Sequence, residues 1–221
     1  MMSDFPEGFE PERVLYSGAE SKIWLGTWMD RRIVLKQRLP KAYRNGELDE
    51  GLRISRTTGE ALSLHECKLA GVRAPYVYYV NPKTGTILMS YVEGPTLTEL
   101  LRKGNGSWVR PAGSSVGKLH TQGISHGDLT PSNLLVSGDE VVLLDFGLSE
   151  RTNDIERFAE DLNVMIGALK SLVGERWEYL WEEFESGYLE EGSPRCRETI
   201  ERLKLVQGRG RYRRKEDRRS H

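Results

Sequence analysis

The sequence predicts an α+β protein with two lobes, a small β-rich lobe followed by a larger helical one. Short runs of β-branched and aromatic residues, separated by turn residues, fill the first third of the chain. Beyond Glu93-Gly94-Pro95 the spacing of apolar residues becomes helical. The stretch SHGDLTPSNLL, at 125–135, places oxygen-bearing side chains in a loop just before an apolar run, which indicates a functional site in the second lobe.

The first lobe reads as strands joined by turns. Gly18-Ala19, Met29-Asp30-Arg31 and the Asn-Pro-Lys-Thr-Gly at 81–85 are the turn signals. We expect strands at 14–16, 23–28, 32–36, 77–80 and 87–89, and one long helix at about 48–69. The break at 93–95 is the expected joint, so we assign 1–92 to the first lobe.

The second lobe, 93–206, is expected to be mainly helical. Helices are predicted at 97–102 and 109–121 and over most of 154–206, with a hairpin of strands 134–136 and 141–144 between them. Trp177, Leu180, Trp181 and Phe184 share one helical face, which favours core packing, with a partner interface as the alternative. Residues 207–221 form a separate tail.

Composition limits the class of protein. The 221 residues carry a net charge of -1, which gives no overall bias toward nucleic acid, but 208–221 holds seven Arg or Lys against two acids. Two cysteines, Cys67 and Cys196, without a CxxC pair exclude a disulfide framework and a zinc knuckle. With no signal-peptide pattern and no apolar run of ~20 residues, we expect a cytoplasmic protein that does not enter a membrane, with a nuclear pool if it is eukaryotic.

The hairpin explains the oxygen-rich loop. Asn133 precedes its first strand and Asp145 follows its second strand, so an antiparallel hairpin brings both to one end. Asp128 lies one loop turn away. Oxygen ligands beside phosphates suit Mg²⁺. Turn capping by Asp128 and Asn133 is the alternative, but it explains neither Asp145 nor the Phe-Gly after it.

The complete pattern, D-x4-N, a hairpin and D-F-G, resembles the catalytic core of the protein-kinase superfamily. The resemblance implies that Asp128 orients or deprotonates an attacking hydroxyl, and that Asn133 and Asp145 hold Mg²⁺ on the phosphates of ATP. It also implies a lysine on the third strand, which Lys36 in IVLK provides. Glu60 is the expected carboxylate partner of Lys36, with Glu47, Glu50 and Glu66 as alternatives.

The remaining nucleotide contacts are expected in two segments. The phosphate loop departs from G-x-G-x-x-G, because the turn reads Ser17-Gly18-Ala19-Glu20-Ser21 with a single glycine and an acid near its tip. Backbone N–H groups of this turn can still face phosphate, while Glu20 must point away or help to hold a metal or the catalytic lysine. The hinge is expected at 89–94: main-chain groups of Ser90 and Val92 would bind adenine, and apolar walls would come from Met89, Ala61, Ile87 and Leu135.

Further stretches make the resemblance narrower. SGAES, VLKQRLPKAYR, RTTGEA, HGDLTPSN, DFGLSE and RGRYRR together resemble the small atypical Ser/Thr kinases of the KEOPS complex, the p53-related protein kinase family, over 14–214. That family implies an ATPase with Ser/Thr autophosphorylation that supports threonylcarbamoyladenosine modification of tRNA. It implies a sugar-kinase-like threonylcarbamoyltransferase subunit and other KEOPS subunits as partners.

Two departures from ordinary kinases accompany this resemblance. Gly127 replaces the arginine before the catalytic Asp, and no A-P-E segment follows DFG, so the platform for peptide substrates is largely missing. The resemblance also implies that the second lobe is truncated. We expect Asp161 to lie on a buried helix below the catalytic loop and His126 to pack beside Phe146. A surface position for Asp161 is the alternative.

The basic segments have two interpretations. The tail can be a solvated end, or its arginines (Arg209, Arg211, Arg213 and Arg214) can bind the tRNA backbone with help from Arg38, Lys41 and Arg44. Two other functions compete with the KEOPS assignment. One is a RIO-like protein kinase in ribosome assembly, and the other is a pseudokinase that binds nucleotide without chemistry. The complete set of Lys36, Asp128, Asn133 and Asp145 argues against the pseudokinase.

Overall fold

A computed structural model describes residues 5–41 and 45–217, with side chains up to 207. Its contacts divide the chain into two compact units: the first comprises 1–66 and 74–93, and the second comprises 67–73 and 94–221. The division after Glu93 lies one residue from the boundary expected from sequence. We expected the segment Cys67–Arg73 in the first lobe, but it belongs to the helical unit, where Arg73 O accepts from Leu143 N (2.8 Å).

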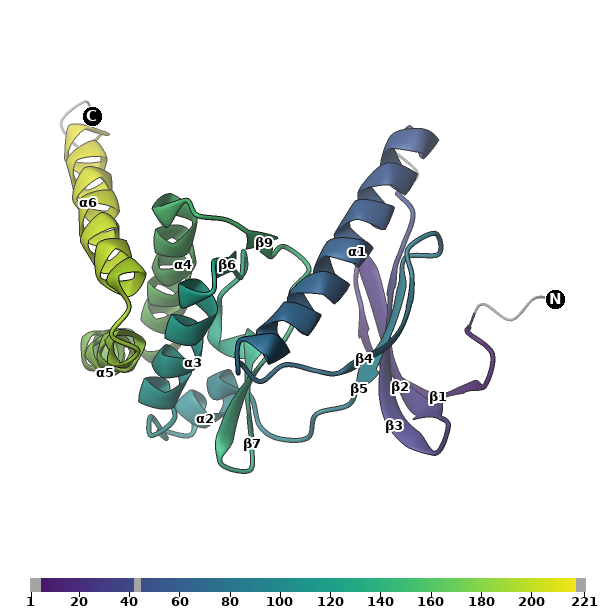
Figure 1. Ribbon diagram of the computed structural model, residues 1–221. Helices are drawn as coiled ribbons and strands as arrows, with labels where there is room; N and C mark the ends of the chain where they lie inside the picture. The colour runs from purple at the N-terminus through teal and green to yellow at the C-terminus, as the bar shows by residue number, and fades with distance from the viewer. Residues whose placement is uncertain (1–4, 42–44, 218–221) are drawn as a thin grey trace. The chain divides into compact units, whose positions relative to one another are not determined.

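The first unit is built on one antiparallel sheet. Its strands are β1 (Phe9–Ser17), β2 (Ser21–Trp28), β3 (Arg31–Arg38), β4 (Val77–Asn81) and β5 (Thr86–Ser90), in the order β1-β2-β3-β5-β4. The helix α1 (Gly46–Leu69) lies beside the sheet (Figure 1). Met29 and Asp30 both have positive φ (49° and 58°), as the two central residues of a tight β-hairpin turn require.

The strand period of two separates the faces of this sheet. Ile33 and Leu35 on β3 belong to a buried cluster with Phe9, Trp24 and Leu88. The alternate residues of β3, Lys36 and Arg38, contact α1 instead, as described below. The sheet therefore places apolar packing on one face and a buried charged group on the other.

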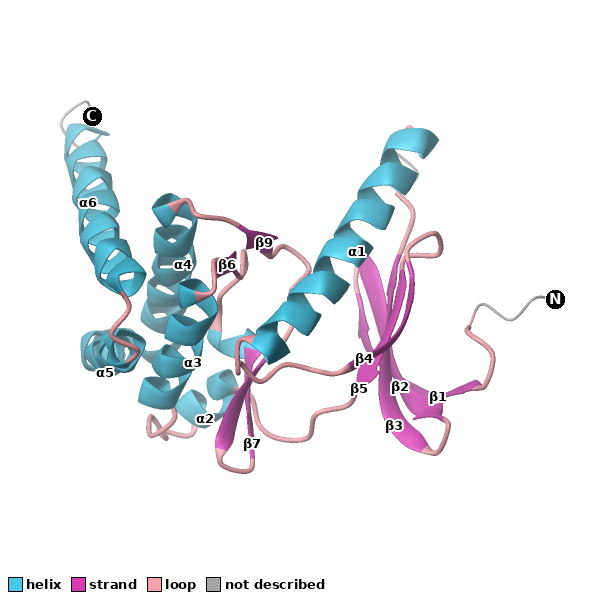
Figure 2. Ribbon diagram, viewed as in Figure 1, coloured by secondary structure: helices cyan, strands magenta, loops and turns pink. Residues whose placement is uncertain are grey.

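The second unit is mainly helical (Figure 2). Its helices are α2 (Leu97–Arg102), α3 (Val109–Thr121), α4 (Ile155–Val173), α5 (Trp177–Glu190) and α6 (Pro194–Asp217), with short 3₁₀ turns η1 (Pro131–Asn133) and η2 (Gly174–Arg176). Side chains cap two of these helices. Thr96 and Glu99 form a reciprocal capping box on α2, and Asp154 Oδ1 accepts from Glu156 N (3.0 Å) at the start of α4.

Helix pairs form the core of the second unit: α3 packs on α5, and α4 packs on α6. The approach of α3 and α5 requires a glycine, because a Cβ at Gly113 would lie 2.0 Å from Phe184 O. Leu180 and Phe184 of the predicted apolar face of α5 are buried, and Phe184 stacks with Trp181 (ring centroids 5.5 Å apart). The structure thus supports core packing for this face.

Two small β-pairs carry the loops of the second unit. The hairpin of β7 (Leu134–Ser137) and β8 (Glu140–Leu143) is antiparallel, as expected from sequence, while β6 (Ile124–Ser125) pairs with β9 (Glu150–Arg151). In sequence, the strands of the second pair enclose the proposed catalytic loop, 126–133, and the DFG segment at 145–147.

Two further results concern the tail and the apolar segments. The backbone of α6 continues as helix through Asp217, so the predicted tail at 207–221 begins inside a helix; Arg, Lys and Glu favour this extension, although Gly208 and Gly210 oppose it. Both cysteines are buried, and they are not joined in a disulfide. Within 5–41 and 45–217, no helix combines the length and hydropathy needed to cross a membrane.

Candidate functional site

A buried ion cluster joins β3 to α1 in the first unit. Lys36 Nζ lies 2.7 Å from Glu60 Oε1, and Arg38 NH2 lies 2.5 Å from Glu60 Oε2. The Lys36, Arg38 and Glu60 side chains are 6%, 9% and 2% exposed, respectively. The Lys36–Glu60 contact expected from sequence is present, and the alternative partners Glu47, Glu50 and Glu66 are not needed for it.

The second cation in this cluster was not anticipated. Residues i and i+2 of a strand share a face, so Lys36 and Arg38 reach the same carboxylate. Removing one partner from a buried ion pair leaves an uncompensated charge, which is strongly unfavourable. Because Arg38 keeps Glu60 paired, Lys36 can turn toward another anion at a lower cost.

The burial of Arg38 corrects one prediction. We expected Arg38 to help bind the tRNA backbone, but its buried guanidinium is directed at Glu60 and cannot serve as a surface cation. Lys41 lies against Glu20, and Arg44 falls outside the described residues. The structure therefore gives no support to these three residues as one phosphate-binding surface.

The predicted phosphate loop is the tight turn between β1 and β2. Gly18 N donates to Ser21 O (3.0 Å), which closes the turn across Ala19 and Glu20. The carboxylate of Glu20 pairs with Lys41 and lies 3.6 Å from Arg56 NH1. Lys41 and Arg56 of the same unit thereby compensate the negative charge of Glu20, which would otherwise repel the phosphates of a nucleotide.

The predicted hinge is partly committed to the sheet. Ser90 N donates to Tyr76 O (2.8 Å), and Ser90 Oγ accepts from Tyr76 N (2.9 Å). The Ser90 N–H is therefore engaged, which leaves the Ser90 carbonyl and the main chain of Val92 as candidates for adenine. Met89 in the first unit and Leu135 in the second are 8% and 7% exposed, as expected for apolar wall residues.

The catalytic loop and the hairpin meet in the second unit. Asn133 Nδ2 donates to Asp128 O (2.8 Å) and to Asp128 Oδ2 (3.1 Å). Both partners are acceptors, so the amide orientation is fixed and Oδ1 of Asn133 is directed elsewhere. Asn133 O accepts from Leu144 N (2.8 Å), which brings the residue before Asp145 to the same end of the hairpin.

Asp145 has an unusual backbone conformation. Its φ is 54°, in the left-handed region that Asp visits more readily than most residues, and its Oδ1 accepts from Gly147 N (3.2 Å). Such conformations concentrate at functional sites. The Phe146 ring lies 5.0 Å from the His126 ring, as expected from sequence.

A steric cause accounts for Gly127 in the catalytic loop. Its φ is 80°, and a Cβ there would lie 2.2 Å from Leu148 O. No other residue fits without moving the DFG segment. The absence of the usual kinase arginine is thus built into the contact between the two loops.

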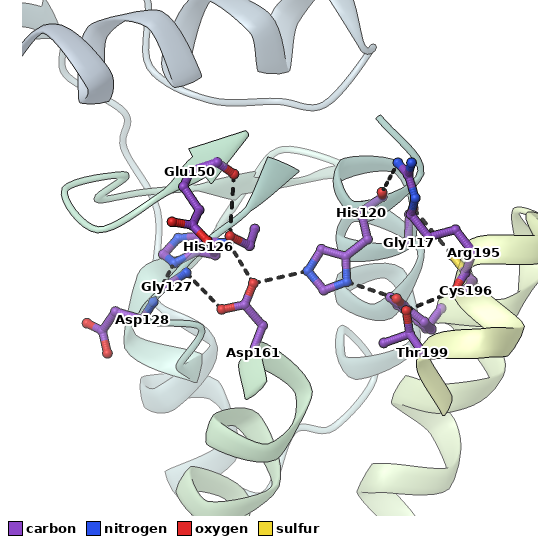
Figure 3. A network of polar contacts seen from close by, with 12 residues as sticks. Gly117, His120, His126, Gly127, Asp128, Glu150, Asp161, Arg195, Cys196 and Thr199 are labelled. Carbon is purple, nitrogen blue, oxygen red and sulfur yellow. Dashed lines mark hydrogen bonds and ion pairs between the residues drawn. The ribbon is translucent and has the colours of Figure 1, made fainter. Parts of the chain in front are cut away.

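Asp161 on α4 supports the catalytic loop from below. Its Oδ2 accepts from His126 N (2.6 Å) and its Oδ1 from Gly127 N (2.8 Å), while His120 Nε2 lies 3.2 Å from Oδ2 (Figure 3). Burial raises the pKa of this carboxyl, but hydrogen bonds from His120 and the loop outweigh it, so the pKa is below its ordinary value. The predicted position of Asp161 is confirmed.

His126 is held as a neutral imidazole. Burial lowers its pKa, and its two nitrogens have distinct partners. Nε2 lies 2.9 Å from Leu144 O, to which it must donate, while Nδ1 accepts from Asp128 N (3.3 Å). This ring therefore joins the start of the catalytic loop to the strand end that precedes Asp145.

The donor set fits a hard divalent cation bound together with phosphates. The described residues contain no group of three or more His, Cys, Asp or Glu side chains placed to hold a metal alone. Asn133 Oδ1 and the Asp145 carboxylate are oxygen ligands of the kind Mg²⁺ takes when phosphate and water complete its shell.

Comparison with known proteins agrees with this geometry. The model of the protein kinase domain family matches residues 9–177. The KEOPS complex subunit Bud32 of Pyrococcus abyssi is 38% identical over 212 residues, which cover 91% of this chain and 96% of that protein. The probable bifunctional tRNA threonylcarbamoyladenosine biosynthesis protein of Methanothermobacter thermautotrophicus is 35% identical, but this chain spans only 39% of its length.

A solved structure shows the same fold at low identity. The Rio2 kinase of Chaetomium thermophilum, in an ADP/Mg²⁺-phosphoaspartate complex, aligns with a TM-score of 0.58 and 13% identity over 92% of this chain and 72% of that chain. This match concerns the fold alone. The kinase-domain match and the near full-length similarity to the Pyrococcus protein show that the chain belongs to the protein kinase family and, within it, to the Bud32 family of KEOPS subunits.

Proposed function

We propose that the chain is a Mg-ATP-dependent phosphotransferase and ATPase that supports threonylcarbamoyladenosine modification of tRNA as a KEOPS subunit. The geometry of the catalytic loop supports the chemical part of this proposal. The Asn133 side chain donates to Asp128, so its amide oxygen Oδ1 faces away from Asp128, at the end of the hairpin where Asp145 follows. The 38% identity to the Pyrococcus Bud32 protein over nearly its whole length carries the biological part.

Each residue has a distinct role in this proposal. Lys36, held by Glu60, binds the phosphates of ATP, and Asn133 and Asp145 hold Mg²⁺. The metal, when bound, neutralises charge on the phosphates. Asp128 orients the attacking water or hydroxyl and accepts its proton, while the turn 17–21 offers N–H groups to phosphate.

The missing peptide platform favours hydrolysis of ATP, or phosphorylation of a partner that is already bound, over free choice of protein substrates. Serine or threonine is the proposed acceptor in the second case. Gly127 cannot be replaced by the arginine that receives an activating phosphate in ordinary kinases. We therefore propose that partners, and not phosphorylation of a loop, control the activity.

The proposed partners are a sugar-kinase-like threonylcarbamoyltransferase subunit, other KEOPS subunits and tRNA. Relatives described as bifunctional are more than twice as long as the matched region, which supports action together with a second protein of the same process. The basic tail is the proposed tRNA contact. The proposed compartment is the cytoplasm.

The test measures ADP release by wild type, Asp128→Ala and Asp145→Ala, with and without tRNA and the partner subunit. We expect a loss of about 100-fold or more in each variant, because positioning and charge stabilisation provide most of phosphoryl-transfer catalysis. Unchanged turnover in both variants would reject the enzyme and favour a nucleotide-binding pseudokinase. A pull-down that does not recover the partner subunit would reject the complex.

The RIO-like alternative is less well supported. The Rio2 structure shares the fold at 13% identity, against 38% for the Pyrococcus Bud32 protein. Association with ribosomal precursors, and not with the partner subunit, would reverse this preference.

A further inference from the structure

Tyr188 on α5 is linked to the catalytic loop through a continuous chain of buried polar groups, of which Figure 3 shows His120, Asp161, His126 and Gly127. Tyr188 OH on α5 lies 2.8 Å from His120 Nδ1, and His120 Nε2 lies 3.2 Å from Asp161 Oδ2. The same carboxylate accepts from the backbone of His126 and Gly127. Tyr188 and His120 are 0% exposed and Asp161 is 3% exposed, so water does not compete for these bonds.

The hydrogen bond between His120 and Asp161 has a fixed direction. Asp161 is ionised and accepts at Oδ2, so His120 carries a proton on Nε2. The other ring nitrogen, Nδ1, has the Tyr188 hydroxyl as its hydrogen-bond partner. Burial raises the pKa of Tyr188, so the phenol keeps its proton. Tyr188 thus holds the His120 ring in the orientation in which Nε2 faces Asp161.

Residues of α6 hold the same region from the other side. Arg195 NH1 donates to His120 O (3.0 Å) and Thr121 O (2.9 Å), the last carbonyls of α3. Arg195 NH2 donates to Asn153 Oδ1 (2.9 Å) in the segment before α4. Cys196 is fully buried, and its Sγ lies 3.6 Å from Gly117 O. The end of α3 leads within five residues to His126, so α6 fixes where the catalytic loop begins.

We propose that Tyr188 and Arg195 are positioning residues for Asp128. They touch neither the nucleotide nor the reacting atoms in this scheme. Tyr188 acts through His120 and Asp161 on the two N–H groups that precede Asp128, and Arg195 acts through the end of α3. The end of α5 and the start of α6 thereby set the placement of the proposed catalytic carboxylate. The kinetic test of this proposal rests on the proposed function, whereas the structural test does not.

The contacts beyond Asp161 distinguish this inference from simple packing. A phenyl ring would fill the site of Tyr188 equally well, yet it could not form the hydrogen bond with His120 Nδ1. The buried His120 could then change its tautomer or its ring orientation. The bond to Asp161 would weaken, and with it the hold on His126 and Gly127. A small displacement of a catalytic group is sufficient to lower the rate strongly.

The test compares Tyr188→Phe and Arg195→Met with Ile200→Val, a control that trims a buried apolar side chain on α6 without a polar contact. Amide hydrogen exchange of His126 and Gly127 is measured by NMR under conditions that favour the native state. We expect exchange at these two amides to be about tenfold faster or more in Tyr188→Phe and Arg195→Met, and unchanged in Ile200→Val, because the local bonds have weakened.

Steady-state kinetics supply the second readout. We expect kcat for ATP to fall about tenfold in Tyr188→Phe with little change in KM, since nucleotide contacts are not touched. Ile200→Val should retain kcat at a comparable loss of melting temperature. Unchanged amide exchange in Tyr188→Phe, or an equal fall of kcat in Ile200→Val, would overturn the proposal. If wild type shows no turnover, the proposed function fails, and the exchange measurement still decides this inference.

Discussion

The substitution Glu60→Gln tests the buried ion cluster of the first unit most sharply. Gln keeps the shape of the side chain but removes the charge shared by Lys36 Nζ (2.7 Å) and Arg38 NH2 (2.5 Å). The carboxylate is 2% exposed, so solvent cannot replace it. Loss of one partner from a buried ion pair costs about 3–5 kcal/mol, which is a large share of the ~5–15 kcal/mol that stabilises a typical domain.

Urea unfolding followed by circular dichroism measures this loss. Glu140→Gln is the control, since Glu140 pairs with Arg73 at a similar distance (2.7 Å) while both side chains are about half exposed, and it should cost at most ~1 kcal/mol. The triple variant Lys36→Met, Arg38→Met and Glu60→Leu should recover much of the stability, because apolar replacement removes all three charges together. A loss in Glu60→Gln no larger than that of the control would refute the reasoning.

Three other predictions follow from single features. Gly127→Ala should lose at least ~1–3 kcal/mol more unfolding free energy than Gly138→Ala; both glycines have positive φ, but only Gly127 faces a carbonyl oxygen at 2.2 Å, and equal losses would contradict the steric account. The free energy of unfolding of wild type should fall as pH falls below about 6.5, because burial lowers the pKa of His126 and the imidazole is protonated in the unfolded chain before it is protonated in the folded one. His126→Gln should flatten this pH dependence, and the same dependence in wild type and His126→Gln would contradict the prediction. Truncation after Gln207 should weaken tRNA binding and reduce its salt dependence in filter-binding assays, and an unchanged salt slope would exclude the tail as a phosphate contact.

Local patterns predicted most of the secondary structure. The expected bounds of α2 and α3 agree with the structure, and the β7–β8 hairpin lies where it was expected. The first strand was underestimated: β1 spans Phe9–Ser17, not 14–16, because Pro11 and several charged residues hide its pattern. These residues are tolerated since β1 is an edge strand with bulges near Pro11 and Val14.

Site residues were predictable where a motif is local. The convergence of Asp128, Asn133 and Asp145 was expected from their spacing and a hairpin, and Lys36 was expected from the resemblance to kinases. The commitments of Arg38 to Glu60 and of the Ser90 amide to Tyr76 were missed, since both depend on tertiary contacts.

The side-chain contacts that hold the catalytic loop were harder to predict from the sequence. His120 and Tyr188 are 68 residues apart, and neither belongs to a motif. The sequence around Arg195 shows only a charged residue in the first turn of a helix, and its contacts with the end of α3 depend on how the helices pack. Such long-range pairs become visible only when the helices are packed.

Magnesium-dependent nucleotide binding tests the central claim most directly. Isothermal titration of ADP is compared with Mg²⁺ and with EDTA, for wild type and for Asp145→Asn. If Asn133 and Asp145 hold the metal on the phosphates, wild type should bind ADP at least about tenfold more tightly with Mg²⁺, and Asp145→Asn should lose this difference. Equal Mg²⁺ enhancement in both proteins would contradict the assigned metal site and the chemistry built on it.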